Sequence, residues 1–122
     1  MYKDHEVSGK HLICDLREIQ NKELLNSLAQ MKTLLDSICE KYDFHILHKT
    51  EHAFTPQGFT ILYMLAESHI SIHTFPEKEY LALDIYTCRL YPDNSVYEEI
   101  HEWLVSSLQA KREIPLILDR YF

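Results

Sequence analysis

The sequence predicts an α+β fold, a two-layer sandwich in which one antiparallel sheet carries two helices on a single face. Two long amphipathic segments predict the helices, and short alternating or apolar runs joined by hairpin-length connections predict the strands. The 122 residues suffice for one hydrophobic core and are too few for two. We therefore expect a single domain over residues 1–122.

The first half of the chain predicts a strand, a helix and another strand. Residues 11–16 (HLICDL) form an apolar run that is typical of a buried strand. From 21 to 42, apolar residues recur every three or four positions, which predicts one amphipathic helix. Residues 44–52 alternate weakly and predict the next strand.

Three further strands follow in close succession. The run at 59–66 (FTILYMLA) is apolar throughout, as expected for a central strand. Residues 69–75 and 80–88 alternate between polar and apolar side chains, and a polar turn at 76–79 joins them. Short connections of this kind favour antiparallel pairing.

A second helix and a last strand complete the chain. Asn94 or Ser95 can cap a helix that extends to about residue 111, with apolar residues at four-residue spacing. Residues 114–118 predict the final strand.

The hairpin around 76–79 brings reactive side chains together. Pairs in a simple antiparallel hairpin place Asp84 opposite Ser71 and Cys88 opposite Glu67. A thiol would then lie beside the peptide bond that follows Glu67. An error of one residue in the register, in either direction, would not change this.

Ser68, His69 and His73 lie on the strand that faces this thiol. The cluster is either catalytic or a polar covering for a solvated sheet face, and the residues alone leave both open. His69 and His73 can share a face, but no third ligand stands at a typical spacing, so we expect no metal site.

The charge balance bears on the kind of partner. The chain has 12 Lys and Arg against 19 Asp and Glu, a formal net charge of −7, which argues against a nucleic-acid partner and favours a neutral or cationic small molecule.

No apolar stretch is long enough to span a membrane, and residues 1–10 lack the apolar core of a signal peptide. Three cysteines without a paired framework fit reduced thiols, so we expect a cytoplasmic protein.

Five segments resemble a known family in order along nearly the whole chain. They are GKHL (9–12), FTPQG (54–58), AESHISIHTFPE (66–77), YTC (86–88) and AKR (110–112). The third resembles the processing site of the prokaryotic-type, pyruvoyl-dependent S-adenosylmethionine decarboxylases, and its ESH-x-x-x-H-T block is the most specific.

The resemblance implies self-cleavage. In that family the serine of ESH, here Ser68, attacks the carbonyl of the preceding residue, here Glu67, and ends as a pyruvoyl group. The products would be chains 1–67 (the β chain) and 68–122 (the α chain). The pyruvoyl group would then form a Schiff base with the substrate and draw electrons from the bond to the carboxylate.

By position, two further residues match the family's processing machinery. His73 matches its processing histidine, and Thr60 stands where a serine hydroxyl usually assists. Thr60 retains the hydroxyl, so we expect slower cleavage rather than none; a plain strand-forming role is the alternative. On a regular strand Ser68 and His73 have opposite parity, so the chain must bend for them to meet.

Other positions match catalysis and substrate binding. Cys88 matches the family's proton donor, although a small buried thiol would be an ordinary core residue. Phe54 and Phe75 match aromatics that enclose adenine, with core packing as the alternative, and Glu77 matches an acid that holds the ribose.

Two positions beside the expected reactive centre depart from the family pattern. Arg89 and Ile61 stand where glycine is common, and either can reshape the pocket.

The leading interpretation is decarboxylation of S-adenosylmethionine, which yields the aminopropyl donor for spermidine synthesis. Two alternatives remain open. One is the same pyruvoyl chemistry on arginine or ornithine, and the other is an unprocessed relative that acts only as a binding partner.

The strand at 59–66 also predicts self-association, because it is apolar on both faces and a one-layer sheet buries only one of them. We expect a homodimer or higher homo-oligomer in which two sheets pack as an α-β-β-α sandwich. The resemblance implies the same, with active sites near the interface that contain residues from both copies.

Overall fold

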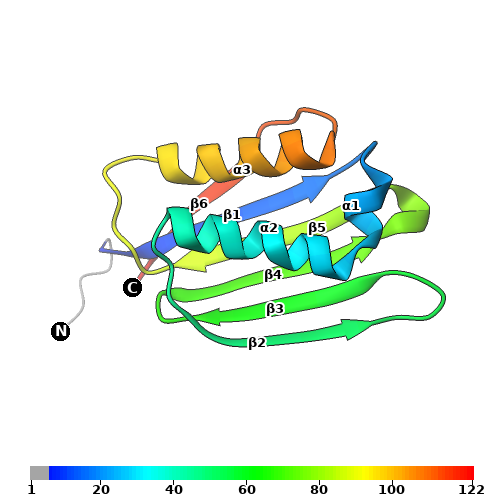
Figure 1. The fold of residues 1–122 in the computed structure, drawn as a ribbon. Coiled ribbons are helices and arrows are strands. Elements are labelled where there is room, and N and C mark those ends of the chain that lie inside the picture. The colour runs from blue at the N-terminus through cyan, green and yellow to red at the C-terminus, as the bar shows by residue number, and fades with distance from the viewer. Residues whose placement is uncertain (1–5) are drawn as a thin grey trace.

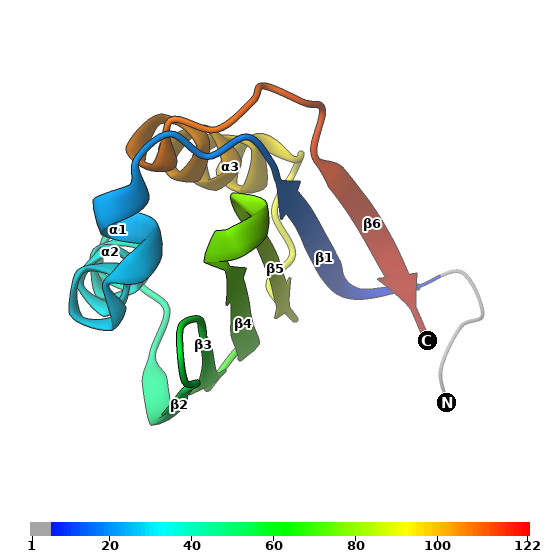
Figure 2. The same cartoon turned by 90° about the vertical axis from the view of Figure 1, so that its right-hand side faces the viewer.

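Six antiparallel strands form one sheet in a computed structural model that describes residues 6–122, and the helices lie on one face of this sheet (Figures 1 and 2). The strand order is β2-β3-β4-β5-β1-β6. The elements are β1 (Val7–Leu16), α1 (Lys22–Asn26), α2 (Leu28–Lys41), β2 (Ile46–Ala53), β3 (Phe59–Leu65), β4 (Ser68–Phe75), the short 3-10 helix η1 (Pro76–Lys78), β5 (Tyr80–Thr87), α3 (Ser95–Leu108) and β6 (Leu116–Tyr121). The predicted fold class is confirmed.

The β4–β5 hairpin has the predicted register. Ser71 lies opposite Asp84, and Ser68 lies opposite Thr87. The turn contains η1 and ends at Glu79, whose left-handed backbone (φ 52°) reverses the chain.

The hydrophobic core fills the space between the sheet and the helices. Strand β3 shows the division between the two faces: Ile61 and Tyr63 are buried under the helices, whereas Leu62 and Met64 are 43% and 56% exposed on the opposite face. We call this second face, which none of the helices within residues 6–122 covers, the open face. It carries alternate residues of all the central strands.

The prediction of one helix over 21–42 is wrong in one respect, because this segment forms two helices. Ser27 has an extended backbone, and its hydroxyl accepts a hydrogen bond from the amide of Gln30 at 3.1 Å, which caps α2. Asn21 caps α1 in the same way.

The outer strands are also placed differently from the prediction. Strand β1 begins at Val7 rather than near residue 11, and β6 covers Leu116–Tyr121 rather than 114–118. Their pairing explains both shifts, since Val7 lies opposite Tyr121. No helix among the described residues is long and apolar enough to cross a membrane.

Candidate active site

The tight turn between β3 and β4 contains the predicted cleavage point. Leu65 pairs with Ser68, so only Ala66 and Glu67 make the reversal. Ser68 has φ 147°, a conformation that glycine adopts readily and other residues rarely do. Such a backbone costs on the order of 1–3 kcal/mol and is common at reactive positions.

Cys88 lies beside this turn, as predicted. Its amide donates a hydrogen bond to the Glu67 carbonyl oxygen at 2.9 Å, and its side chain is exposed. Gly9 lets β1 approach the end of β5 closely, because a Cβ atom there would lie 2.1 Å from the carbonyl oxygen of Thr87. The carbonyl that Ser68 would attack therefore already has one backbone donor.

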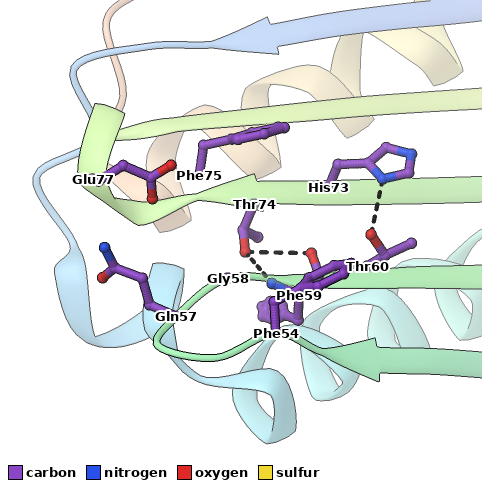
Figure 3. A pocket seen from close by; sticks show the side chains of 9 residues that line it. All are labelled: Phe54, Gln57, Gly58, Phe59, Thr60, His73, Thr74, Phe75 and Glu77. Carbon is purple, nitrogen blue, oxygen red and sulfur yellow. Dashed lines mark hydrogen bonds between the residues drawn. The ribbon is translucent and has the colours of Figure 1, made fainter.

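A cavity of about 400 Å³ at the other end of β4 gathers the remaining predicted residues (Figure 3). They are Phe54, Thr60, His73, Phe75 and Glu77. Phe54 and Phe75 lie on opposite sides of the cavity and are 53% and 41% exposed, so neither is a core residue.

Hydrogen bonds fix the walls of this cavity. Thr60 lies opposite His73, and its hydroxyl is 3.0 Å from Nδ1 of that histidine. The Thr74 hydroxyl accepts from the Phe59 amide at 2.9 Å, and Gly58 turns the preceding loop with φ 91°. The hydroxyl of Thr60 is thus a partner of the histidine and more than a strand-forming feature.

The fold of the single chain does not bring Ser68 and His73 together. They are five residues apart on the same extended strand, which is about 16 Å. A smaller cavity of about 340 Å³ lies at the Ser68 end, and Leu62, Met64 and His69 help to line it. Each cavity is lined in part by residues of the open face, and buried residues of the helix-covered face, such as Tyr63 and Thr74, also contribute.

A polar cluster that the sequence did not reveal also lies on the open face, across β1, β4 and β5. Asp84 Oδ2 is 2.7 Å from His11 Nε2 and 3.0 Å from His69 Nε2, and the Ser71 hydroxyl donates to Oδ1. Burial acts to raise the pKa of Asp84, but these hydrogen bonds outweigh it and hold that pKa below its usual value. Asp84 is therefore a carboxylate that accepts from three side chains.

Three potential metal ligands meet in this cluster, since atoms of His11, His69 and Asp84 lie within 4.8 Å of one another. Arg120 Nη1 is 3.1 Å from His11 Nδ1, and a guanidinium can only donate, so Nδ1 is the acceptor. The hydrogen of the His11 ring is then on Nε2, where it points at Asp84. The contacts are those of a hydrogen-bonded network, and they leave His11 Nε2 without the lone pair that a metal needs.

One sequence signal could have indicated this cluster. Asp84 is the single charge inside the run YLALDIYTC, and the register already placed it opposite Ser71. The contribution of His11 depends on the pairing of β1 with β5, which local patterns do not reveal.

Comparison with known proteins gives a consistent result. The family model for S-adenosylmethionine decarboxylase matches residues 10–120. A proenzyme of that name from Prochlorococcus marinus (strain MIT 9211) is 40% identical over 104 residues, which are 85% of this chain and 82% of the relative. The proenzyme from Clostridium botulinum (strain Loch Maree / Type A3) is 35% identical over 110 residues, 89% of this chain and 94% of the relative.

A solved structure has the same fold. The crystal structure of the adenosylmethionine decarboxylase from Aquifex aeolicus VF5 matches with a TM-score of 0.81 and 26% identity, over 96% of this chain and 93% of that one.

Fold and relatives together define a small α+β enzyme of the decarboxylase class. The chain belongs to the S-adenosylmethionine decarboxylase family. The resemblance of segment 66–77 to that family is thereby confirmed.

Proposed function

We propose that this chain cleaves itself between Glu67 and Ser68 and then decarboxylates S-adenosylmethionine by means of a pyruvoyl group formed from Ser68. The observation that carries the proposal is the Ser68 turn: a strained serine follows a carbonyl that already accepts a hydrogen bond from the Cys88 amide. The names of the relatives, which call them proenzymes, support the cleavage step.

The cleavage proceeds by rearrangement of the backbone. The Ser68 oxygen bonds to the Glu67 carbonyl carbon while its proton leaves, and the C–N bond breaks as the nitrogen gains a proton, which leaves an ester. Loss of the Ser68 α-proton then breaks the Cβ–Oγ bond, freeing chain 1–67 with a terminal carboxylate. Water hydrolyses the remaining dehydroalanine, and ammonia leaves with the formation of the pyruvoyl end of chain 68–122. The Cys88 amide stabilises the oxyanion of the first step.

Residues of this chain fit a pyruvoyl group at position 68. The Ser68 end has an apolar-lined cavity and an exposed thiol at Cys88. When formed, the group supplies the electron sink for loss of carbon dioxide. In the proposal Cys88 donates the proton that replaces the carboxylate, since a thiol S–H can serve as a general acid.

The aromatic cavity supplies the substrate contacts. Phe54 and Phe75 on its two sides would enclose the adenine and attract the sulfonium cation, and Glu77 would hold the ribose hydroxyls. A cavity of about 400 Å³ is in the range of small-molecule sites.

A two-fold dimer completes the site in this proposal. The two cavities lie at opposite ends of β4 and on the same open face, so two copies packed through that face with antiparallel β4 strands would set one cavity against the other. His73 and Thr60 of one copy would then act at Ser68 of the other, which removes the separation of about 16 Å within a protomer. Leu62 and Met64, exposed in the protomer, would be covered.

Carbon dioxide release tests the function directly. Protein with complete cleavage should release labelled carbon dioxide from carboxyl-labelled S-adenosylmethionine, while arginine and ornithine should give none above a Ser68→Ala control. Release from arginine or ornithine alone would assign the basic-amino-acid activity instead. No release from any of the three by cleaved protein would identify a non-catalytic relative.

We place the enzyme in the cytoplasm, where its three unpaired cysteines would stay reduced.

The dimer gives a second expected result. Light scattering at micromolar concentration should give at least twice the protomer mass of 14.5 kDa, because the open face exposes Leu62 and Met64. Met64→Lys should lower the mass toward one protomer and reduce turnover with it, whereas Leu47→Lys, at another exposed leucine on β2, should not. Full activity at a mass near 14.5 kDa would show that one protomer suffices.

A further inference from the structure

The Glu67 carboxylate, on the residue before the cleavage point, is held on both oxygens. Its Oε1 accepts from the His45 amide at 2.9 Å, and its Oε2 accepts from His45 Nδ1 at 2.8 Å and from Arg89 Nη2 at 3.2 Å. The side chain is only 12% exposed. A turn residue at a surface hairpin is normally free, so this degree of fixation requires an explanation.

Arg89 is itself anchored to the end of helix α2. Its Nη1 donates to the Tyr42 carbonyl at 2.6 Å, its Nη2 also donates to the Asp43 carbonyl, and its guanidinium lies over the Phe44 ring at 5.1 Å. A helix C-terminus favours a cation, and the planar guanidinium presents five N–H donors in a fixed fork that can serve several acceptors at once. Arg89 thus fastens the hairpin turn to a rigid element.

Glu67 and Arg89 carry opposite charges in this group. Burial acts to raise the pKa of Glu67, but hydrogen bonds from His45 and the charge of Arg89 lower it to about 2, so the side chain is ionised at neutral pH. The pKa of His45 is raised, first by its hydrogen bond to Glu67 and then by Asp43. The three side chains therefore form a charge-assisted unit rather than a neutral contact.

The backbone of the same turn is pinned as well. The Glu67 carbonyl accepts from the Cys88 amide, and the Ala66 amide donates to the His45 carbonyl at 2.8 Å. From Ser68 to His73, β4 is paired on both sides. Ser68, with φ 147°, lies between two fixed segments, and a strained backbone persists only where its surroundings hold it.

We propose that Arg89 and His45 clamp the Glu67 carboxylate in order to hold the bond between residues 67 and 68 in its strained, cleavable geometry. Both are positioning residues: they contact neither the Ser68 hydroxyl nor the carbonyl under attack, and they act through the Glu67 side chain. The clamp keeps the Glu67 carbonyl on the Cys88 amide while Ser68 attacks. The inference rests on the proposed self-cleavage and specifies what sets its rate.

Pulse–chase translation with intact-mass detection tests the clamp, because it follows cleavage and not turnover. Arg89→Met and Glu67→Gln should each slow cleavage by about 10- to 100-fold, the scale of losing a hydrogen bond to a charged group. The double variant should be no slower than the slower single variant, since each change disables the same contact. Arg112→Met, which breaks a similar Arg–Glu pair with Glu102 on the surface of α3, should cleave as the wild type does.

A fold control separates positioning from general stability. The same changes are placed in Ser68→Ala chains, which cannot cleave, and their melting temperatures are compared. Slower cleavage by a variant that melts as its background does supports the clamp. Cleavage of Arg89→Met at the wild-type rate overturns it; if Arg89→Met does not fold, wild-type cleavage by Glu67→Gln overturns it equally. An intact wild-type chain would instead refute the self-cleavage on which the inference rests.

Discussion

Ser68→Ala should remain a single chain of full length under conditions in which the wild type separates into 1–67 and 68–122. The expected effect is complete, because alanine has no oxygen to form the ester and no β-leaving group for the elimination that follows. The strained backbone at this position, the Glu67 carbonyl and its Cys88 donor would all remain. Only the reacting atom is removed.

Intact-mass measurement checks this result at both new ends. The wild type should give one fragment that ends with the Glu67 carboxylate and one that begins with a pyruvoyl group, while Ser68→Ala gives neither. Ser106→Ala, on the exposed surface of α3, serves as a serine control and should cleave normally. A wild-type chain that stays whole after long incubation would contradict the claim that it matures unaided.

The sequence predicted the sheet and its central register because alternation and short connections are local properties. On β4 the side chains alternate with a period of two. This explains directly why Ile70 and Ile72 are buried and why His73 and Phe75 are exposed. The sequence called for a bend that would let Ser68 meet His73, whereas β4 extends from Ser68 to Phe75 without bringing the two together, and Ser68 itself has the unusual φ of 147°. The break at Ser27 was missed, because a capping serine inside an apolar helical pattern looks like one more polar position.

The site was harder to predict because its residues are spread over distant strands. Local pairing placed Cys88 beside Glu67, yet the partners of Glu67 in the folded chain include His45, which is 22 residues away. Arg120 and His11 meet across 109 residues through the β1–β6 pairing. The separation of Ser68 from His73 is a property of a straight strand, and it becomes an argument for a second protomer only when both cavities are seen on one face.

A Cys88→Ala chain should still cleave itself and form the pyruvoyl group, but its turnover should fall by about 10²–10⁴, the usual scale for losing a positioned acid. Cleavage should persist because the Cys88 contribution to it is the backbone amide, which alanine retains, whereas protonation of the product carbon needs the thiol. Binding of substrate should be little changed, since the aromatic cavity proposed to supply its contacts is built from other residues. The change thus separates two roles of one position.

The measurement is turnover per pyruvoyl end, so that incomplete cleavage does not imitate a loss of catalysis. Cys39→Ala is the matched control: its thiol is buried on α2, burial raises its pKa to about 12, and its loss should leave turnover per site at the wild-type level even if the chain unfolds at a lower temperature. Near wild-type turnover by fully cleaved Cys88→Ala would remove the thiol from the reaction. The proton would then have to come from another donor at the same end of the sheet, and His69, held by Asp84 and lining the Ser68 cavity, would be the next residue to replace.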